Sequence, residues 1–318
     1  MNGPAPTGPK ASEGADSMRF NLLVALAFVG WMALPSVPGA TLAVQEGGAR
    51  LDAVRAAIEA GRYADAEAEA ERAFAQSTAA AGGVFDAERG EALAEALLRN
   101  GRGAESRTSQ LAQQTFQARR ARAGPDDPSM AAILRILGEV LYEAGDYPRA
   151  IERFQEAVRV AERAEGRGVE ETRSLDSLAK ALLQNDQLDP ALAAAERALA
   201  ISDRPGGSDS ALAKALETRG QVLQRKGEYL HARADLDRAM TLRERGSLLH
   251  PELAGTCMWV GLQFWFEGDP VQARVFLSRA VSIAEAGLRA DHPDIATYLR
   301  SLAVPLQDLG DLSSVRVL

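Results

Sequence analysis

The residues best suited to chemistry are three histidines and one cysteine in a chain of 318 residues. His250 and His292 each precede a proline where a helix is expected to begin, so we expect their side chains to cap those helices. His231 lies in a helical stretch without a metal-ligand pattern around it. Cys257 lies at an apolar helical position, which predicts a small buried residue and not a nucleophile.

No other spacing is typical of an enzyme. Gly206-Gly207 lacks the lysine and the serine or threonine of a phosphate-binding loop, and no nucleophile elbow is present. The Glu and Asp residues recur at helical surface spacing, and no pair stands out as an acid and base. We therefore predict no catalytic residues, no metal and no cofactor, and a protein that is not an enzyme.

The elements that carry these residues are helical hairpins, and the clearest one spans 133–160. Gly145 is suited to a left-handed helix end, Asp146 to a cap on the next helix, and Pro148 to that helix's first turn. Apolar residues on each side recur every three or four positions and so share one face: Leu134, Leu137, Val140 and Leu141, then Ala150, Ile151, Phe154, Ala157 and Val158.

The hairpin recurs along the chain. Its turn residue repeats at spacings of 41, 41, 41 and 42: Gly145, Asp186, Gly227, Gly268 and Gly310. Small residues recur where the two helices should cross: Gly138, Ala179, Gly220, Gly261 and Ala303 in the first helix, and Ala150, Ala191, Ala232 and Ala273 in the second. Agreement of several columns at one period predicts an array in which each hairpin buries its apolar face against the next.

These columns resemble the tetratricopeptide repeat, whose signature spacings are matched by Leu137-Gly138, Leu141, Ala150, Phe154 and Ala157. The period is longer than the usual 34 residues, and His-Pro pairs precede helices. In both respects the chain is similar to the 42-residue repeats of kinesin light chains and their bacterial relatives. The resemblance implies an all-α, right-handed superhelical solenoid of antiparallel hairpins, with six to seven repeats, that binds proteins.

The N-terminal region has a different composition. Residues 1–17 are rich in Gly, Pro and Ser and predict a disordered extension. Residues 18–43 read as a signal peptide: Met18-Arg19, a 15-residue apolar run, Pro35, then small residues. This predicts a secreted or periplasmic bacterial protein. An uncleaved anchor is the alternative, and it would be the chain's only contact with a membrane.

The array is expected to fill residues 44–318. Its first hairpin is predicted at 50–60 and 63–76, and its second at 85–123. Aligned on Gly101, this repeat has Ser106, Gln110 and Gln113 in the columns that hold alanine and a large apolar residue elsewhere. The spacing of 44 from Gly101 to Gly145 leaves about three extra residues and predicts a longer second helix. Repeats three to six are predicted at 127–163, 169–202, 208–245 and 250–288. A seventh begins at Asp291, and its second helix, 311–318, is short, so the last repeat is expected to be incomplete.

The family pattern assigns five positions of each first helix to the concave side. In repeats three to five they are mostly polar and of mixed charge: Ala132, Arg135, Glu139, Tyr142 and Glu143; Arg173, Asp176, Lys180, Leu183 and Gln184; Lys214, Glu217, Gln221, Gln224 and Arg225. Repeat seven has Thr297, Arg300, Val304, Gln307 and Asp308. Repeat six differs, with Gly255, Met258, Leu262, Trp265 and Phe266.

Apolar residues that include Trp and Phe, within a polar groove, are typical of a binding hot spot. We therefore predict that a peptide or partner helix binds a set of six residues: Met258, Leu262, Trp265, Phe266, Arg225 and Arg300. The alternative is that these side chains only bury one another.

The net charge of −8 argues against nucleic acid as a partner, because phosphate binding needs a basic surface. The leading hypothesis is a non-enzymatic scaffold that binds a protein or peptide ligand in its concave groove. The alternative is the sensor or regulatory portion of a larger signalling protein or caspase-like, CHAT-type protease. The incomplete last repeat is the motive for that alternative.

Overall fold

The computed structural model describes residue 3 and residues 38–80, 84–124, 127–163 and 168–315. It divides into two units, Met1–Gly48 and Ala49–Leu318, of which the second contains the array. The predicted extension at 1–17 and residues 18–37 of the predicted signal peptide lie outside the described residues. All regular structure in the described ranges is helical, and no helix there is long and apolar enough to cross a bilayer.

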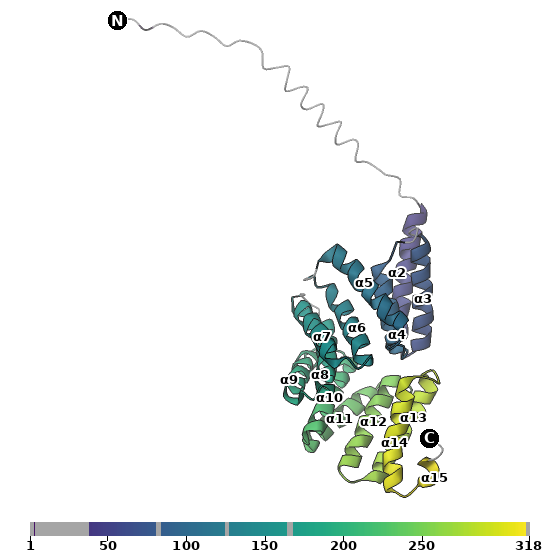
Figure 1. Ribbon diagram of the computed structural model, residues 1–318, viewed down its shortest axis with the longest axis vertical. Coiled ribbons are helices and arrows are strands. Elements are labelled where there is room, and N and C mark those ends of the chain that lie inside the picture. Colours follow the sequence, from purple (N-terminus) through teal and green to yellow (C-terminus); the bar gives the residue numbers. More distant parts are fainter. Residues whose placement is uncertain (1–2, 4–37, 81–83, 125–126, 164–167, 316–318) are drawn as a thin grey trace. The chain divides into compact units, whose positions relative to one another are not determined.

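The array consists of consecutive helical hairpins (Figure 1), each formed by two helices that we number as one repeat. Repeats one to four are α2 (Pro38–Glu59) and α3 (Tyr63–Ala80), α4 (Ala87–Arg99) and α5 (Ser106–Ala123), α6 (Met130–Glu143) and α7 (Tyr147–Glu162), and α8 (Gly168–Gln184) and α9 (Leu188–Ser202). Repeats five to seven are α10 (Asp209–Lys226) and α11 (Tyr229–Glu244), α12 (Pro251–Phe266) and α13 (Pro270–Gly287), and α14 (Pro293–Asp308) and α15 (Leu312–Val315).

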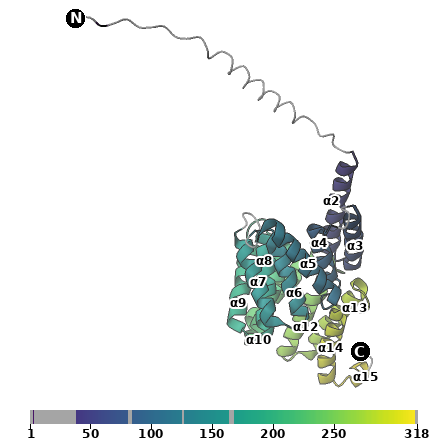
Figure 2. The same ribbon diagram turned by 45° about the horizontal axis from the view of Figure 1, so that its top comes forward.

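The first helices form the inner layer of the curved array. From α4 to α14 each first helix contacts the next first helix along the chain, whereas none of the second helices from α5 to α13 contacts another second helix. In a bent stack the inner elements lie closer together than the outer ones. The predicted all-α solenoid and the predicted layering of its helices are therefore confirmed (Figures 1 and 2).

The turns have the conformation that the sequence predicts. Gly145 takes a φ of 76°, and Asp186, the one non-glycine residue in this column, takes a φ of 59°. The Asp146 carboxylate accepts a hydrogen bond from the Arg149 amide at 3.3 Å and so caps α7. The alanine columns are fully buried at the helix crossings, with Ala150, Ala191, Ala232 and Ala273 at 0% exposure.

Repeat one departs from the sequence prediction at its first helix. We expected that helix to begin at Arg50, but α2 begins at Pro38. Proline fits the first turn of a helix, because its missing amide hydrogen would have no partner there. The following residues contain no further proline, and Gly47 and Gly48 weaken a helix without ending it.

Repeat two also departs from the prediction. Its second helix is longer than α7, with 18 residues against 16, as expected. However, six residues separate α4 from α5, where three separate α6 from α7, so extra residues lie in the turn. Ser106, Gln110 and Gln113 are consequently exposed, and the buried columns are filled by Thr108, Ala112 and Thr115. The Thr108 hydroxyl donates to the Arg102 carbonyl at 2.7 Å and fixes this longer turn.

Candidate functional site

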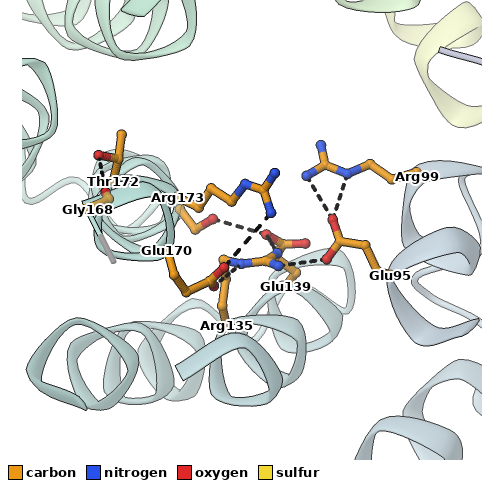
Figure 3. A network of polar contacts seen from close by, with 9 residues as sticks. Glu95, Arg99, Arg135, Glu139, Gly168, Glu170, Thr172 and Arg173 are labelled. Atoms are coloured by element: carbon orange, nitrogen blue, oxygen red, sulfur yellow. Dashed lines mark hydrogen bonds and ion pairs between the residues drawn. The ribbon is translucent and has the colours of Figure 1, made fainter. Parts of the chain in front are cut away.

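A network of ion pairs lies where repeats two, three and four meet on the inner face (Figure 3). At its centre Arg135 of α6, with a side chain only 3% exposed, contacts three carboxylates. Its nitrogens lie 2.7 Å from Glu95 of α4, 2.8 Å from Glu139 of α6 and 2.7 Å from Glu170 of α8. Arg99 of α4 also binds Glu95, at 2.9 Å. The network therefore joins three consecutive first helices.

The charges in this network stabilise one another. Burial alone would lower the pKa of Arg135, but Glu170 and Glu95 raise it well above its ordinary value. Burial likewise disfavours the charged form of Glu95, and Arg135 and Arg99 more than offset it, so the pKa of Glu95 lies well below its usual range. Buried charges of this kind are tolerated only when they are paired.

A second polar cluster joins repeats four, five and six. The Thr256 hydroxyl donates to Glu217 at 2.9 Å, and Lys214 lies 3.6 Å from the same carboxylate. Burial is the main cause that lowers the pKa of Lys180 to about 8, and the positive charge of the nearby Lys214 is the second. Asp176 is 5% exposed, and its Oδ1 has no hydrogen-bond partner among the described residues. Burial raises the pKa of Asp176 to about 7, against the opposing effect of Lys180 and Lys214.

Amide side chains continue the same arrangement between repeats five and six. Gln224 of α10 donates to the Gln263 side chain of α12 at 2.9 Å, and Gln263 donates to the Tyr229 carbonyl at 3.0 Å. Much of the inner-face polarity predicted from the sequence is therefore used in contacts between neighbouring first helices. It leaves fewer free polar groups on this face than the sequence pattern suggested.

The structure divides the predicted binding residues into buried and exposed ones. Met258 is 7% exposed and belongs to the core of repeats six and seven, and Leu262 is partly buried against that core. Trp265 is also partly buried, and its indole nitrogen donates to Asp308 of α14 at 2.7 Å. Phe266 is 42% exposed at the end of α12.

Tyr229, which the sequence analysis did not include, forms a cluster with the partly buried Trp265 and the exposed Phe266. Its ring stacks on Phe266, with the ring centroids 5.6 Å apart. The Phe266 ring in turn contacts the Trp265 ring, with the centroids 5.1 Å apart. Leu230 follows Tyr229 and is 86% exposed. We call these four residues, Tyr229, Leu230, Trp265 and Phe266, the aromatic patch. A signal for Tyr229 was present in the sequence, because Tyr147 fills the same repeat position and contacts Tyr142 at 5.4 Å.

The two predicted arginines form no cation–π pair with the aromatic patch in the described structure. Arg225, in the last turn of α10, is exposed and lies 3.2 Å from Asp186 at the preceding turn. Arg300 is exposed on α14. Neither guanidinium lies over an aromatic ring, and the cation–π pairs that the described residues form are Arg120 with Phe116 and Arg233 with Phe264.

His250 and His292 have the predicted capping role. Nδ1 of His250 accepts a hydrogen bond from the Glu252 amide, and Nδ1 of His292 accepts one from the Asp294 amide, both at 3.2 Å. His231 is exposed beside Glu228. Cys257 is fully buried, and burial raises the pKa of its thiol to about 11. Within the described ranges, no group of three or more His, Cys, Asp or Glu residues is arranged to hold a metal ion.

The tetratricopeptide repeat family model matches residues 84–163 and 129–204. These segments contain the hairpins of repeats two to four, with the left-handed turns and buried small residues described above. Residues 84–204 therefore consist of tetratricopeptide repeats (TPRs). A comparison with curated protein sequences finds no match.

Solved structures resemble this chain across most of its length. A Rap protein complexed with competence and sporulation factor is 14% identical, with 85% of this chain and 74% of that chain covered and a TM-score of 0.64. The Cut9–Hcn1 hetero-tetramer of the APC/C is 13% identical, covers 80% and 42%, and has a TM-score of 0.56. BtubC (BKLC) from P. vanneervenii is 18% identical, covers 74% and 88%, and has a TM-score of 0.49. At these identities the first two likenesses show the fold alone.

Proposed function

We propose that this protein is a non-enzymatic scaffold that binds a protein or peptide segment at the aromatic patch. The observation that carries the proposal is the exposure of stacked aromatic side chains, with Tyr229 at 37% and Phe266 at 42%, next to the exposed Leu230, which follows Tyr229 in the sequence. Single exposed apolar residues are ordinary on protein surfaces, but a contiguous group marks an interaction site.

The contacts within the aromatic patch favour binding. Aromatic residues dominate binding hot spots because each buries a large area and has few rotatable bonds. Here the stack of Tyr229 on Phe266 and the hydrogen bond from Trp265 to Asp308 hold the rings in place before a partner arrives. Rings that are already ordered lose less conformational entropy on binding.

The patch occupies the ends of two rigid elements, the start of α11 and the end of α12. A partner with two or three apolar side chains on one face, such as an amphipathic helix or an extended peptide, matches such a surface. Two structural neighbours, the Rap protein and Cut9, were solved as complexes with a partner. That precedent supports a binding role for the same architecture here.

The proposal is tested by affinity capture with the full chain from extracts of the source cell, read by mass spectrometry. A Trp265→Ala/Phe266→Ala variant removes two rings of the patch. The matched control is Tyr142→Ala/Tyr147→Ala, because these tyrosines form an aromatic pair in repeat three, with Tyr142 at the repeat position of Trp265 and Tyr147 at that of Tyr229. We expect a partner that is retained by the wild type and the control and lost by the patch variant.

Stability must be measured on the same samples. If Trp265→Ala lowers the melting temperature strongly and leaves partner capture unchanged, the rings serve only packing and the proposal fails. A folded patch variant that loses its partner supports the proposal.

We further propose that the protein is exported, on the strength of the basic, apolar and small-residue segments at 18–43. N-terminal sequencing of the protein from its source cell tests this. A mature start near Ala40–Ala43 supports cleavage and export, whereas a start at Met1 or Met18 supports the uncleaved anchor.

A further inference from the structure

The first two repeats contact the last two through two matching hydrogen bonds. Nε2 of His250 lies 3.1 Å from the carbonyl oxygen of Glu59, across 191 residues of sequence. Nε2 of His292 lies 3.3 Å from the carbonyl oxygen of Arg99, across 193 residues. In each case a turn inside an early repeat meets the start of a first helix five repeats later.

Close packing accompanies both hydrogen bonds. Gly61 and Gly101 end α2 and α4 with positive φ angles of 71° and 75°. A Cβ on Gly61 would lie 2.5 Å from Cδ of Pro251, and one on Gly101 would lie 2.6 Å from Cδ of Pro293. Each glycine turn therefore rests directly on a His-Pro helix start.

The hydrogen bonds fix the protonation of both rings. Nδ1 of each histidine accepts from a backbone amide two residues later and so carries no proton. The proton is then on Nε2, which donates it to the carbonyl oxygen across the contact. One neutral imidazole thus caps its own helix and binds a distant repeat at the same time.

This closure is separate from the packing that holds the array together. Helices α3, α4 and α5 make no helix-to-helix contact with α12, α13 or α14 in the described part of the chain. No apolar core cluster there joins the first two repeats to the last two. The contact therefore consists of two turns against two helix starts, and it can open without unfolding any hairpin.

Side chains from both ends of the array lie around the contact. Tyr63, at the start of α3, is 6% exposed, and burial and the charge of Glu252 on α12 raise its pKa to about 12. Arg99 takes part in two contacts, because its carbonyl oxygen accepts from His292 and its guanidinium binds Glu95 of the inner-face network. The closure is thereby linked to the ion pairs of repeats two to four.

We propose that His250 and His292 form a clasp that closes the array into one superhelical turn, and that opening the clasp frees the inner face around Tyr63 and Glu252. The clasp is a conformational device distinct from the aromatic patch. The two lie at opposite ends of α12, about 22 Å apart along a helix of this length.

The first test needs no substitution. With three histidines in the chain, long-range proton–nitrogen NMR of the full-length protein resolves three imidazoles. We expect two of them, His250 and His292, to be locked in the Nε2–H tautomer by the hydrogen bonds at their ring nitrogens. Three imidazoles that all average would overturn the clasp.

The second test opens the clasp and measures its ends. His250→Asn/His292→Asn keeps a residue that caps helices well but is too short to reach the opposite carbonyl oxygen. Nitroxide labels at Ala60→Cys and Leu249→Cys flank one contact, and Cys257 is buried and does not react. The matched control is His231→Asn, at an exposed histidine.

We expect strong dipolar coupling between the labels in the otherwise unmodified chain and in the control, and its loss in the double asparagine variant with the helical circular dichroism retained. Coupling that persists in the double variant would show that other contacts close the array. Weak coupling in the unmodified chain would show that it is open.

Discussion

Phe154 occupies the space that a side chain on Gly138 would need. A Cβ at Gly138 would lie 2.5 Å from Cε1 and 2.6 Å from Cδ1 of the Phe154 ring. The same complementarity recurs along the array. Gly220 lies against Leu236 and Gly261 against Leu277, with Cβ approaches of 3.0 and 2.7 Å. In repeat four both positions are alanine, Ala179 and Ala195, and both are fully buried.

Gly138→Ala should therefore destabilise the protein by up to about 2 kcal/mol in urea unfolding, because overpacking costs about 1–3 kcal/mol and the gain in helix propensity returns about 1 kcal/mol. The cost should shrink in a Phe154→Leu background, as measured by a double-mutant cycle. Gly255→Ala is the control, because its Cβ would meet only the Tyr298 hydroxyl, at 3.6 Å. Equal effects at Gly138 and Gly255 would contradict this account.

Arg135→Met should destabilise the protein by about 3–5 kcal/mol, since it leaves Glu95, Glu139 and Glu170 together without their shared cation. Arg149→Met, which removes an exposed pair with Asp146, should cost about 0–1 kcal/mol. Chemical unfolding at pH 7 compares the two variants.

The pH dependence of Arg135→Met gives a second readout. In the wild type Glu95 has a lowered pKa, so its stabilising effect is present at neutral pH and lost in strong acid. In the variant Glu95 keeps its pair with Arg99, but the three carboxylates have lost their shared cation and repel one another, so stability should rise as the pH falls toward 5. A fall in stability over that range would show that the carboxylates find other partners.

Asp176 predicts a pH dependence of the opposite kind to that of Glu95. Burial raises its pKa from the ordinary 3.8 of an aspartate to about 7, so the folded state holds a proton that the unfolded state releases between these values. Stability should accordingly fall as the pH rises from about 4 to 7 and depend little on this group above 7.

Asp176→Asn removes the titrating group. The variant should match the wild type near pH 4 and exceed it by about 4 kcal/mol at pH 8, because each pKa unit of the shift corresponds to about 1.4 kcal/mol. Asp209→Asn, at an exposed pair with Arg245, should leave the pH profile unchanged. Parallel profiles for wild type and Asp176→Asn would show that Asp176 is ionised throughout.

The left-handed turn at Asp186 has an unfavourable conformation for a residue with a side chain, with a φ of 59°. Asp186→Gly should raise the free energy of unfolding by about 0.5 kcal/mol, because glycine adopts a positive φ without strain. The loss of the exposed ion pair with Arg225 offsets part of this gain. The reverse change, Gly145→Asp, should lower it by about 1 kcal/mol. No atom lies within 4 Å of a Cβ at Gly145, so that loss reports the backbone alone.

The repeat architecture could be read from the sequence because it depends on local spacing. Each turn needs a residue that tolerates a positive φ, and each helix crossing needs a small one, so Gly145 and Ala150 recur with the period of the hairpin. The capping roles of His250 and His292 followed for the same reason, since a cap involves residues only two positions apart.

The turn of repeat two was misread because spacing counts residues without locating them. The additional residues between Gly101 and Gly145 were visible in the sequence. Whether they lengthened the helix or the turn depended on which side chains packed against α4. Burial of Thr108 and Thr115 decided that question.

What the sequence by itself determined is the order of the hairpins, their turns and the residues of their crossings, all set by neighbours within about 20 positions. Only the tertiary structure decided that Tyr229 stacks on Phe266, that Arg135 collects carboxylates from three helices, and that His250 and His292 reach carbonyl oxygens more than 190 residues away. These contacts depend on the curvature of the stack, which is the sum of small rotations at every interface between repeats. No single repeat contains that sum.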